Sequence, residues 1–301
     1  MKRYIRLLLA LITLVSAAPA FASLQIFACE PEWGALAREL GGNDVTIFTA
    51  TTARQDPHRI EARPSLIAQA RRADLLICSG AGLESGWLPL LLRQSGNARI
   101  QPGNDGYLEA AELVERLDIP ASLDRTQGDL HAEGNPHVHL DPHRIMLIAT
   151  QLTDRLARLD NSNAANYRER HALFTQRWQQ SIQKWEASAK PLRGVRAVTR
   201  HSDLRYLFAW LGMESAGTLE PKPGLPVTAG HLAELKQQLT AKPAHMILYS
   251  AYQEARDGEW LARQTGLPLV QLPYTVGVSD QAGDLFALYD ETLRRLLGAL
   301  K

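Results

Sequence analysis

Short apolar runs alternate with longer amphipathic stretches over much of the chain. Apolar runs predict strands at residues 24–28, 45–49 and 75–78, and apolar positions at helical spacing predict helices from Pro31 to Leu40 and over 64–73. The alternation restarts after Pro191, where strands are predicted at 196–199, 246–249 and 269–272 and helices at 203–211, 228–238, 260–265 and 283–300. Strands that alternate with helices pair in parallel, so the pattern predicts an α/β fold with two lobes.

The middle of the chain has a different pattern. Residues 144–159 and 164–189 are helical in spacing, with no strand between them. The second stretch would extend about 39 Å at 1.5 Å per residue, and we interpret it as a rigid connector. The predicted organisation is a signal peptide (1–22), an N-terminal α/β lobe (23–160), a long connecting helix (161–190) and a C-terminal α/β lobe (191–301).

The first 22 residues have the features of a secretory signal peptide. Three basic residues precede an apolar run at 7–18, and Ala20-Phe21-Ala22 fits a cleavage site. The run is short for a membrane anchor. Cleavage after Ala22 would remove Lys2, Arg3 and Arg6 and no acidic residue, and the formal charge would change from +1 to −2. We therefore expect a periplasmic protein without a basic surplus for nucleic acid.

The chain has two cysteines, Cys29 and Cys78, each near the end of a predicted strand. An even number of cysteines in an exported protein favours a disulfide over two buried free thiols. The segment Ile26-Phe27-Ala28-Cys29 faintly resembles a lipoprotein cleavage site. It lies too far from the apolar run at 7–18, so we expect no lipid anchor.

Histidines are the candidate metal ligands. Four of the nine fall between residues 131 and 143, and neutral imidazole is the commonest metal ligand in proteins. His58, His137 and His201 each lie at a strand-to-helix turn or in a loop that enters a helix. Ligands of open α/β sheets bind beyond the carboxyl ends of strands, so these three could converge on one cleft between the lobes. His143 and His171 are expected to be exposed, His231 to lie on a helix surface and His245 at the entry to a strand.

Four segments resemble motifs of the metal-ion solute-binding proteins of ABC transporters, the zinc and manganese group. They are Asp56-Pro57-His58, Gly80-Ala81-Gly82-Leu83-Glu84, Asn135-Pro136-His137-Val138-His139-Leu140-Asp141-Pro142 and His201-Ser202-Asp203. The resemblance covers nearly the whole mature chain. It implies a monomer that captures one metal ion between its lobes and delivers it to a membrane permease with a cytoplasmic ATPase.

Two departures from the family pattern concern histidines. Many members carry an aromatic residue in place of His139, and many zinc-type members carry a long histidine-rich loop before the second motif. Here only His131 and a short acidic stretch precede that motif. We keep His131 and His139 as candidates for secondary metal contacts.

The fourth ligand is assigned to Asp280, in the loop that follows the predicted strand 269–272. Asp284 is a rival. It lies at the start of the last helix, where the positive end of the helix dipole already accounts for a carboxylate. Glu254 is a weaker rival, and the family pattern favours the loop aspartate. Three imidazoles and a carboxylate suit Zn²⁺ in tetrahedral geometry, with Mn²⁺ as the alternative cargo.

A secreted zinc hydrolase is the competing class of protein. Catalytic zinc keeps an open coordination position and needs a nearby general base. The sequence has no H-E-x-x-H motif, no phosphate-binding loop and no G-x-G-x-x-G. A site closed by four protein ligands suits capture and transport, so we expect a binding protein and no enzyme.

Overall fold

The computed structural model describes residues 23–121 and 131–300. The predicted signal peptide lies outside these residues. Within the described ranges, no helix combines the length and the apolar character that a membrane crossing requires.

The first lobe is built on a four-stranded parallel sheet with the order β2-β1-β3-β4. Its strands are β1 (Leu24–Ala28), β2 (Val45–Thr49), β3 (Leu75–Cys78) and β4 (Tyr107–Glu109). Ile26 of β1 pairs with Ile47 on one side and with Leu75 on the other. The three predicted strands are confirmed, and the short β4 was not predicted.

The second lobe repeats this arrangement with the order β6-β5-β7-β8, again entirely parallel. Its strands are β5 (Arg196–Thr199), β6 (Glu214–Thr218), β7 (Met246–Ser250) and β8 (Leu269–Leu272). The predicted fold class, two parallel α/β lobes with a long helix, is therefore confirmed. Strand β6 was missed.

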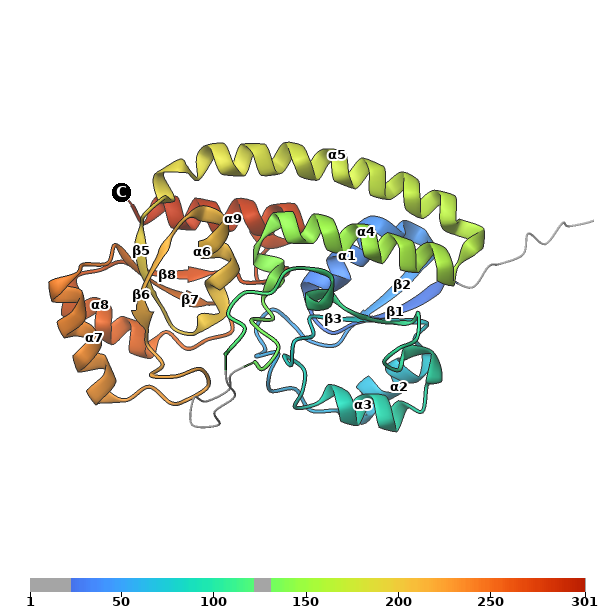
Figure 1. Ribbon diagram of the computed structural model, residues 1–301, viewed down its shortest axis with the longest axis horizontal. Coiled ribbons are helices and arrows are strands. Elements are labelled where there is room, and N and C mark those ends of the chain that lie inside the picture. Colours follow the sequence, from blue (N-terminus) through green and yellow to red (C-terminus); the bar gives the residue numbers. More distant parts are fainter. Residues whose placement is uncertain (1–22, 122–130, 301) are drawn as a thin grey trace, which may run out of the picture.

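Each sheet has its own pair of helices on one face (Figure 1). Helices α2 (Pro64–Arg72) and α3 (Leu88–Ser95) pack on the first sheet through a cluster that contains Phe27, Leu66 and Leu91. Helices α7 (Ala229–Ala241) and α8 (Arg256–Thr265) pack on the second sheet in the same way, through Leu235 and Leu261.

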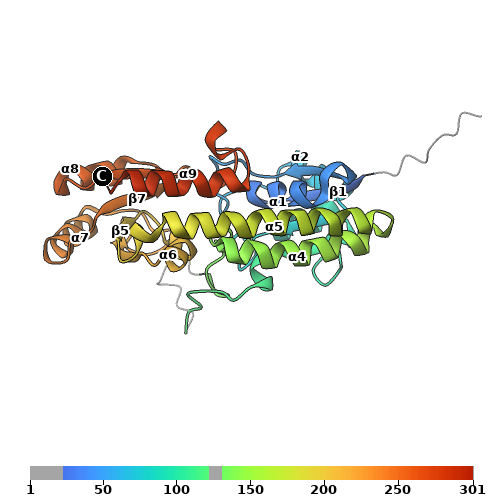
Figure 2. The same cartoon turned by 90° about the horizontal axis from the view of Figure 1, so that it is seen from above.

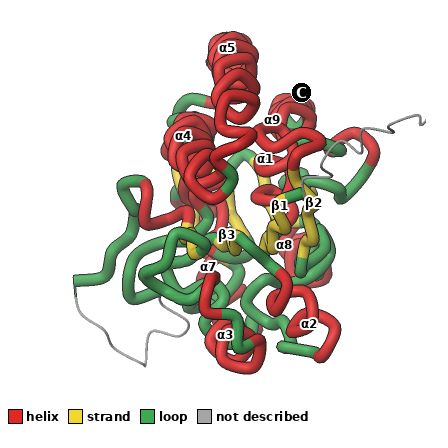
Figure 3. Tube along the Cα trace, turned by 90° about the vertical axis from the view of Figure 1, so that its right-hand side faces the viewer, coloured by secondary structure: helices red, strands yellow, loops and turns green. Residues whose placement is uncertain are grey.

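The opposite faces share one hydrophobic core that runs through both lobes. The helices that cover it are α1 (Pro31–Gly41), α4 (Pro142–Leu159), α5 (Ala164–Ser188), α6 (Arg205–Leu211) and α9 (Leu285–Gly298). Figure 3 shows α4, α5 and α9 on the side of the strands opposite α2 and α3. The two lobes are therefore joined by packing as well as by the chain.

Helix α5 extends along both lobes, with α4 and α9 beside it (Figures 1 and 2). Its buried side chains Phe174, Trp178 and Trp185 pack against Phe286 and Tyr289 of α9. These aromatic contacts fasten the long helix to the C-terminal element of the second lobe. The predicted lobe boundaries, 23–160, 161–190 and 191–301, stay a prediction.

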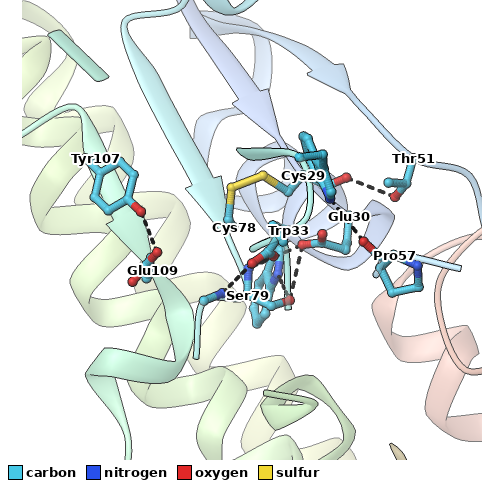
Figure 4. The surroundings of a disulfide bond; sticks show 12 residues. Cys29, Glu30, Trp33, Thr51, Pro57, Cys78, Ser79, Tyr107 and Glu109 are labelled. Carbon is cyan, nitrogen blue, oxygen red and sulfur yellow. Dashed lines mark hydrogen bonds between the residues drawn. A yellow bond between two sulfur atoms is a disulfide. The ribbon is translucent and has the colours of Figure 1, made fainter. Parts of the chain in front are cut away.

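A disulfide joins Cys29 and Cys78, with a Cα–Cα distance of 4.8 Å (Figure 4). Cys29 directly follows β1 and Cys78 ends β3, which are neighbouring parallel strands. Both residues are fully buried. Beside them Glu30 accepts a hydrogen bond from the Ser79 hydroxyl, which in turn accepts one from the Trp33 indole. The bridge thus ties together two strands at their carboxyl ends.

Candidate metal centre

His58 lies in the loop that follows β2. Asp56 Oδ1 accepts hydrogen bonds from the backbone N–H of His58 at 3.0 Å and from its Nδ1 at 2.8 Å. A carboxylate can only accept at neutral pH, so Nδ1 carries the ring proton and Nε2 is free to coordinate. The Asp56-Pro57-His58 motif thus fixes the imidazole of its own third residue.

His137 is held by both lobes. In the first lobe, Asn135 Oδ1 accepts the His137 backbone N–H at 3.1 Å, and Asp141 caps α4 by accepting from the backbone of His143. From the second lobe, the Tyr274 hydroxyl lies 2.8 Å from His137 Nδ1. Tyr274 has φ +66°, a left-handed conformation that is unfavourable for a bulky residue and that often marks functional sites.

His201 follows β5 by two residues and comes from the second lobe. Its Nδ1 lies 2.8 Å from Glu220 Oε2, and the same oxygen accepts the backbone N–H of Gly224 at 3.0 Å. The turn from Glu220 to Gly224, which the sequence shows only as a Pro/Gly-rich segment, therefore has a physical role. It folds back on its own first residue and presents that carboxylate to the imidazole of His201.

The three imidazoles converge at one point between the lobes. Ring centroids are 5.7 Å apart for His58 and His137, 5.8 Å for His58 and His201, and 6.2 Å for His137 and His201. Among the described residues, the buried Nε2 atoms of His137 and His201 have no hydrogen-bond partner. An unpaired buried polar atom costs about 1–3 kcal/mol, and a cation bound by these nitrogens would offset that cost.

The electrostatics of the site differ from one imidazole to the next. Burial, and then the charges of the neighbouring histidines, hold the pKa of His137 well below its usual value. Burial also opposes protonation of His201, but its hydrogen bond to the Glu220 carboxylate and the charges of Asp203 and Glu220 outweigh it and raise its pKa. The pKa of Asp56 is lowered: burial opposes ionisation, but the hydrogen bond and charge of His58 prevail.

His131 also reaches the cluster. Its Nε2 lies 3.3 Å from Nε2 of His58, and its ring centroid lies 6.2 Å from that of His137. Potential ligand atoms of His58, His131 and His137 all lie within 4.8 Å of one another. Burial, followed by the charges of His58 and His201, lowers the pKa of His131 to about 3. The sequence placed this residue only among the secondary contacts.

His139 is buried and is engaged away from the cluster. Its Nε2 donates to the backbone carbonyl of Tyr274 at 3.0 Å, and its Nδ1 lies 3.2 Å from Glu32 Oε1. Glu32 in turn accepts a hydrogen bond from the Thr275 hydroxyl of the second lobe. In this arrangement His139 links the lobes beside the metal centre through Nε2, while its Nδ1 has no hydrogen-bond partner among the described residues.

The three carboxylates considered for the fourth ligand occupy different places. Asp280 is exposed at the start of a short 3₁₀ helix (Asp280–Ala282). Asp284 caps α9 by accepting the backbone N–H of Ala287 at 2.8 Å. Glu254 lines the cleft beside His58 and His201. The assignment of Asp280 stays a prediction that this conformation does not support.

A cleft of about 370 Å³ opens onto the histidines. Its lining includes His58, His201, Asp56, Glu220 and Glu254. Arg59 and Arg200 also line it, so the charges of the lining are mixed. The opening provides a route by which a small ion could reach the imidazoles of His58 and His201.

The other histidines take part in different contacts. His143 is half-exposed and its Nε2 pairs with Glu186, and His231 Nε2 lies 2.8 Å from the backbone oxygen of Thr218. His245 Nδ1 accepts the backbone N–H of Arg196. Sequence reasoning did not find the role of Tyr274, because the contact to His137 spans 137 residues of chain and no local pattern marks it.

The family model described as the periplasmic zinc-uptake complex component A (ZnuA) matches residues 26–301. The match begins within β1 and includes the other strands and all the histidines of the centre. The chain belongs to this family.

Relatives among curated proteins are distant in sequence. The chain is 21% identical over 258 residues to the metal ABC transporter substrate-binding lipoprotein SloC of Streptococcus mutans, which covers 83% of this chain and 81% of SloC. It is 19% identical to the manganese ABC transporter substrate-binding lipoprotein PsaA of Streptococcus pneumoniae (82% and 78% covered) and 20% identical to the zinc-binding protein AdcA of Streptococcus pyogenes (86% and 52% covered).

Solved structures share the fold. A crystal structure of ZnuA superposes with a TM-score of 0.77 at 19% identity and covers 93% of this chain and 100% of that one. The Mn-bound periplasmic metal binding protein from Candidatus Liberibacter asiaticus superposes with a TM-score of 0.75 at 16% identity, with the same coverage. These likenesses support the two-lobed architecture.

Proposed function

We propose that this protein is the zinc-binding component of an ABC importer, which captures Zn²⁺ outside the cytoplasm and delivers it to a membrane permease driven by an ATPase. The family match and the named relatives support a metal substrate-binding role. The relatives include both zinc and manganese proteins, so the choice of metal depends on the donor atoms of this chain.

The observation that carries the choice of zinc is the arrangement of three imidazoles. His58, His137 and His201 each have Nδ1 beside an oxygen atom, which leaves Nε2 for a metal ion. Such oxygen partners orient metal-binding histidines and set their tautomers. Imidazole nitrogen suits zinc, whereas manganese prefers carboxylate, carbonyl and water oxygen.

Capture in this arrangement bridges the lobes. His58 and His137 belong to the first lobe and His201 to the second, so one ion bound by all three joins the two. Tyr206 of the second lobe also donates to the backbone oxygen of Asn135, and Thr275 donates to Glu32. With α5 packed along both lobes, closure would be a small rocking movement, and release would require the permease to separate the lobes.

The proposal also covers the location and the state of the protein. The protein acts as a monomer in the periplasm, binds no nucleic acid and has no lipid anchor, although several relatives are named lipoproteins. A zinc hydrolase is less favoured because the matching family and the named relatives are substrate-binding or uptake components of metal transporters.

Titration of the metal-free mature protein tests the proposal. We expect one Zn²⁺ per chain and an affinity for Mn²⁺ at least a hundredfold weaker, because the donors are nitrogen. Isothermal titration with a competing chelator measures both. His143→Ala is the matched control, since this exposed histidine lies in the same segment but outside the cluster. Absence of zinc binding, or tighter binding of manganese, would reject the proposed function.

A further inference from the structure

We propose that His131 is the fourth zinc ligand, so that the ion is held by four imidazoles and by no carboxylate. This inference rests on the proposed function and specifies the donor set of the same site. It replaces the sequence-based assignment of Asp280, which lies exposed in this structure.

The distance between two ring nitrogens carries the inference. Nε2 of His131 and Nε2 of His58 are 3.3 Å apart. Zinc–nitrogen bonds of about 2.0–2.1 Å at tetrahedral angles place neighbouring ligand nitrogens about 3.3–3.4 Å apart. The two atoms are therefore separated by the edge length of a zinc tetrahedron.

The acceptors beside the other ring nitrogens indicate that both rings carry their proton on Nδ1, so this contact is no hydrogen bond between neutral imidazoles. Nδ1 of His58 donates to the Asp56 carboxylate, so its Nε2 carries a lone pair. The ring of His131 is hydrogen-bonded to the Ala81 backbone, and its Nδ1 is the nitrogen on that side, beside Gly82. A backbone carbonyl only accepts, so Nε2 of His131 also carries a lone pair. Two lone pairs face each other, and a cation between them would turn repulsion into coordination.

The backbone around Ala81 is shaped to hold His131. Gly80, Ala81 and Gly82 have φ values of +76°, +47° and +82°. The left-handed conformation is sterically unfavourable for Ala81, whereas glycine adopts it readily. The buried Glu84 carboxylate holds this turn by accepting the backbone N–H groups of Ser79 at 2.8 Å and Gly80 at 3.1 Å. A carbonyl is thus presented to a fourth imidazole by the segment Gly80-Ala81-Gly82-Leu83-Glu84. This segment supplies no oxygen partner to the other three imidazoles.

The four imidazoles then have the same kind of environment. Each has an oxygen atom beside its second ring nitrogen: Asp56 for His58, Ala81 for His131, Tyr274 for His137 and Glu220 for His201. Two of these oxygen partners are carboxylates, and together they match the double charge of the ion. The complex can therefore be near neutrality without a carboxylate among the ligands, and a site of four nitrogens selects zinc against manganese.

The test compares His131→Ala, Asp280→Ala and the control His143→Ala in the full mature chain. We expect zinc affinity, measured by chelator competition, to fall at least tenfold in His131→Ala and to change less than threefold in the other two. X-ray absorption of the zinc complex should show four imidazole nitrogens in the unsubstituted protein and three in His131→Ala.

Two results would overturn the inference. One is a loss of affinity in Asp280→Ala with none in His131→Ala. The other is an unsubstituted zinc complex with three nitrogens and one protein oxygen, which remains decisive even if His131→Ala fails to fold. Either leaves the proposed function intact, because zinc is still bound. Failure of the unsubstituted protein to bind zinc would instead reject the proposed function itself.

Discussion

Replacing His137 with alanine should lower the affinity for zinc at least a hundredfold. Zinc binding to four protein ligands is worth about 10–16 kcal/mol, so the average share of one ligand is about 3 kcal/mol, and each 1.4 kcal/mol is a factor of ten. His137 is the most buried of the proposed ligands, at 1% exposure, and its Nε2 has no hydrogen-bond partner among the described residues. Water cannot readily take its place.

Tyr274→Phe provides a graded comparison for this prediction. It removes only the hydroxyl that lies 2.8 Å from His137 Nδ1 and keeps the ring that packs against both His137 and His139. Loss of such an oxygen partner costs about 10–100-fold in metal affinity, so this variant should fall between the unsubstituted protein and His137→Ala. Chelator competition at one pH measures all three proteins. Zinc affinity in His137→Ala within threefold of the unsubstituted protein would show that this residue is no ligand.

The double variant Cys29→Ala/Cys78→Ala should lose about 4 kcal/mol of stability. The bridge closes a loop of 49 residues, and the chain-entropy estimate for that length is about 4 kcal/mol. The melting temperature of the metal-free protein should therefore fall on the order of 10 °C. Differential scanning calorimetry measures it, and the unsubstituted protein under strong reductant serves as a second route to the same state.

Zinc affinity should change little in this double variant, because no hydrogen bond among the described residues joins either cysteine to a histidine of the cluster. The prediction thus separates stability from binding. A melting temperature within 2 °C of the unsubstituted protein would mean that the bridge contributes little. Two free thiols in the oxidised, exported protein would show that the bridge does not form there.

Sequence patterns predicted much of the fold because the buried strands are short runs of apolar residues. β1, β2, β3, β5 and β8 begin and end where the pattern placed them. β4 has three residues, and β6 (Glu214–Thr218) is made of small and polar residues with Gly217 at φ +126°, so neither carries an apolar signal. Both are edge strands, where pairing on one side alone holds the segment in place.

The candidate site was only partly predictable. His58, His137 and His201 could be found because parallel sheets gather the loops at the carboxyl ends of their strands. The contacts of Tyr274 and Glu220 depend on how the two lobes are packed, which no local pattern encodes. Asp280 lies in the expected loop, yet the exposure of its side chain is set by the 3₁₀ turn at Asp280–Ala282. His131 reaches His58 across 73 residues of chain.

Uptake of radioactive zinc by cells tests the central claim most directly. Cells that lack this gene should take up zinc slowly from a medium held at low free zinc by a chelator. The unsubstituted protein should restore uptake, and His143→Ala should restore it equally. His137→Ala, produced at the same level, should not. Manganese uptake should be the same in all four strains. Unchanged zinc uptake in cells without the gene, or a loss confined to manganese, would contradict the proposal that this protein serves zinc import.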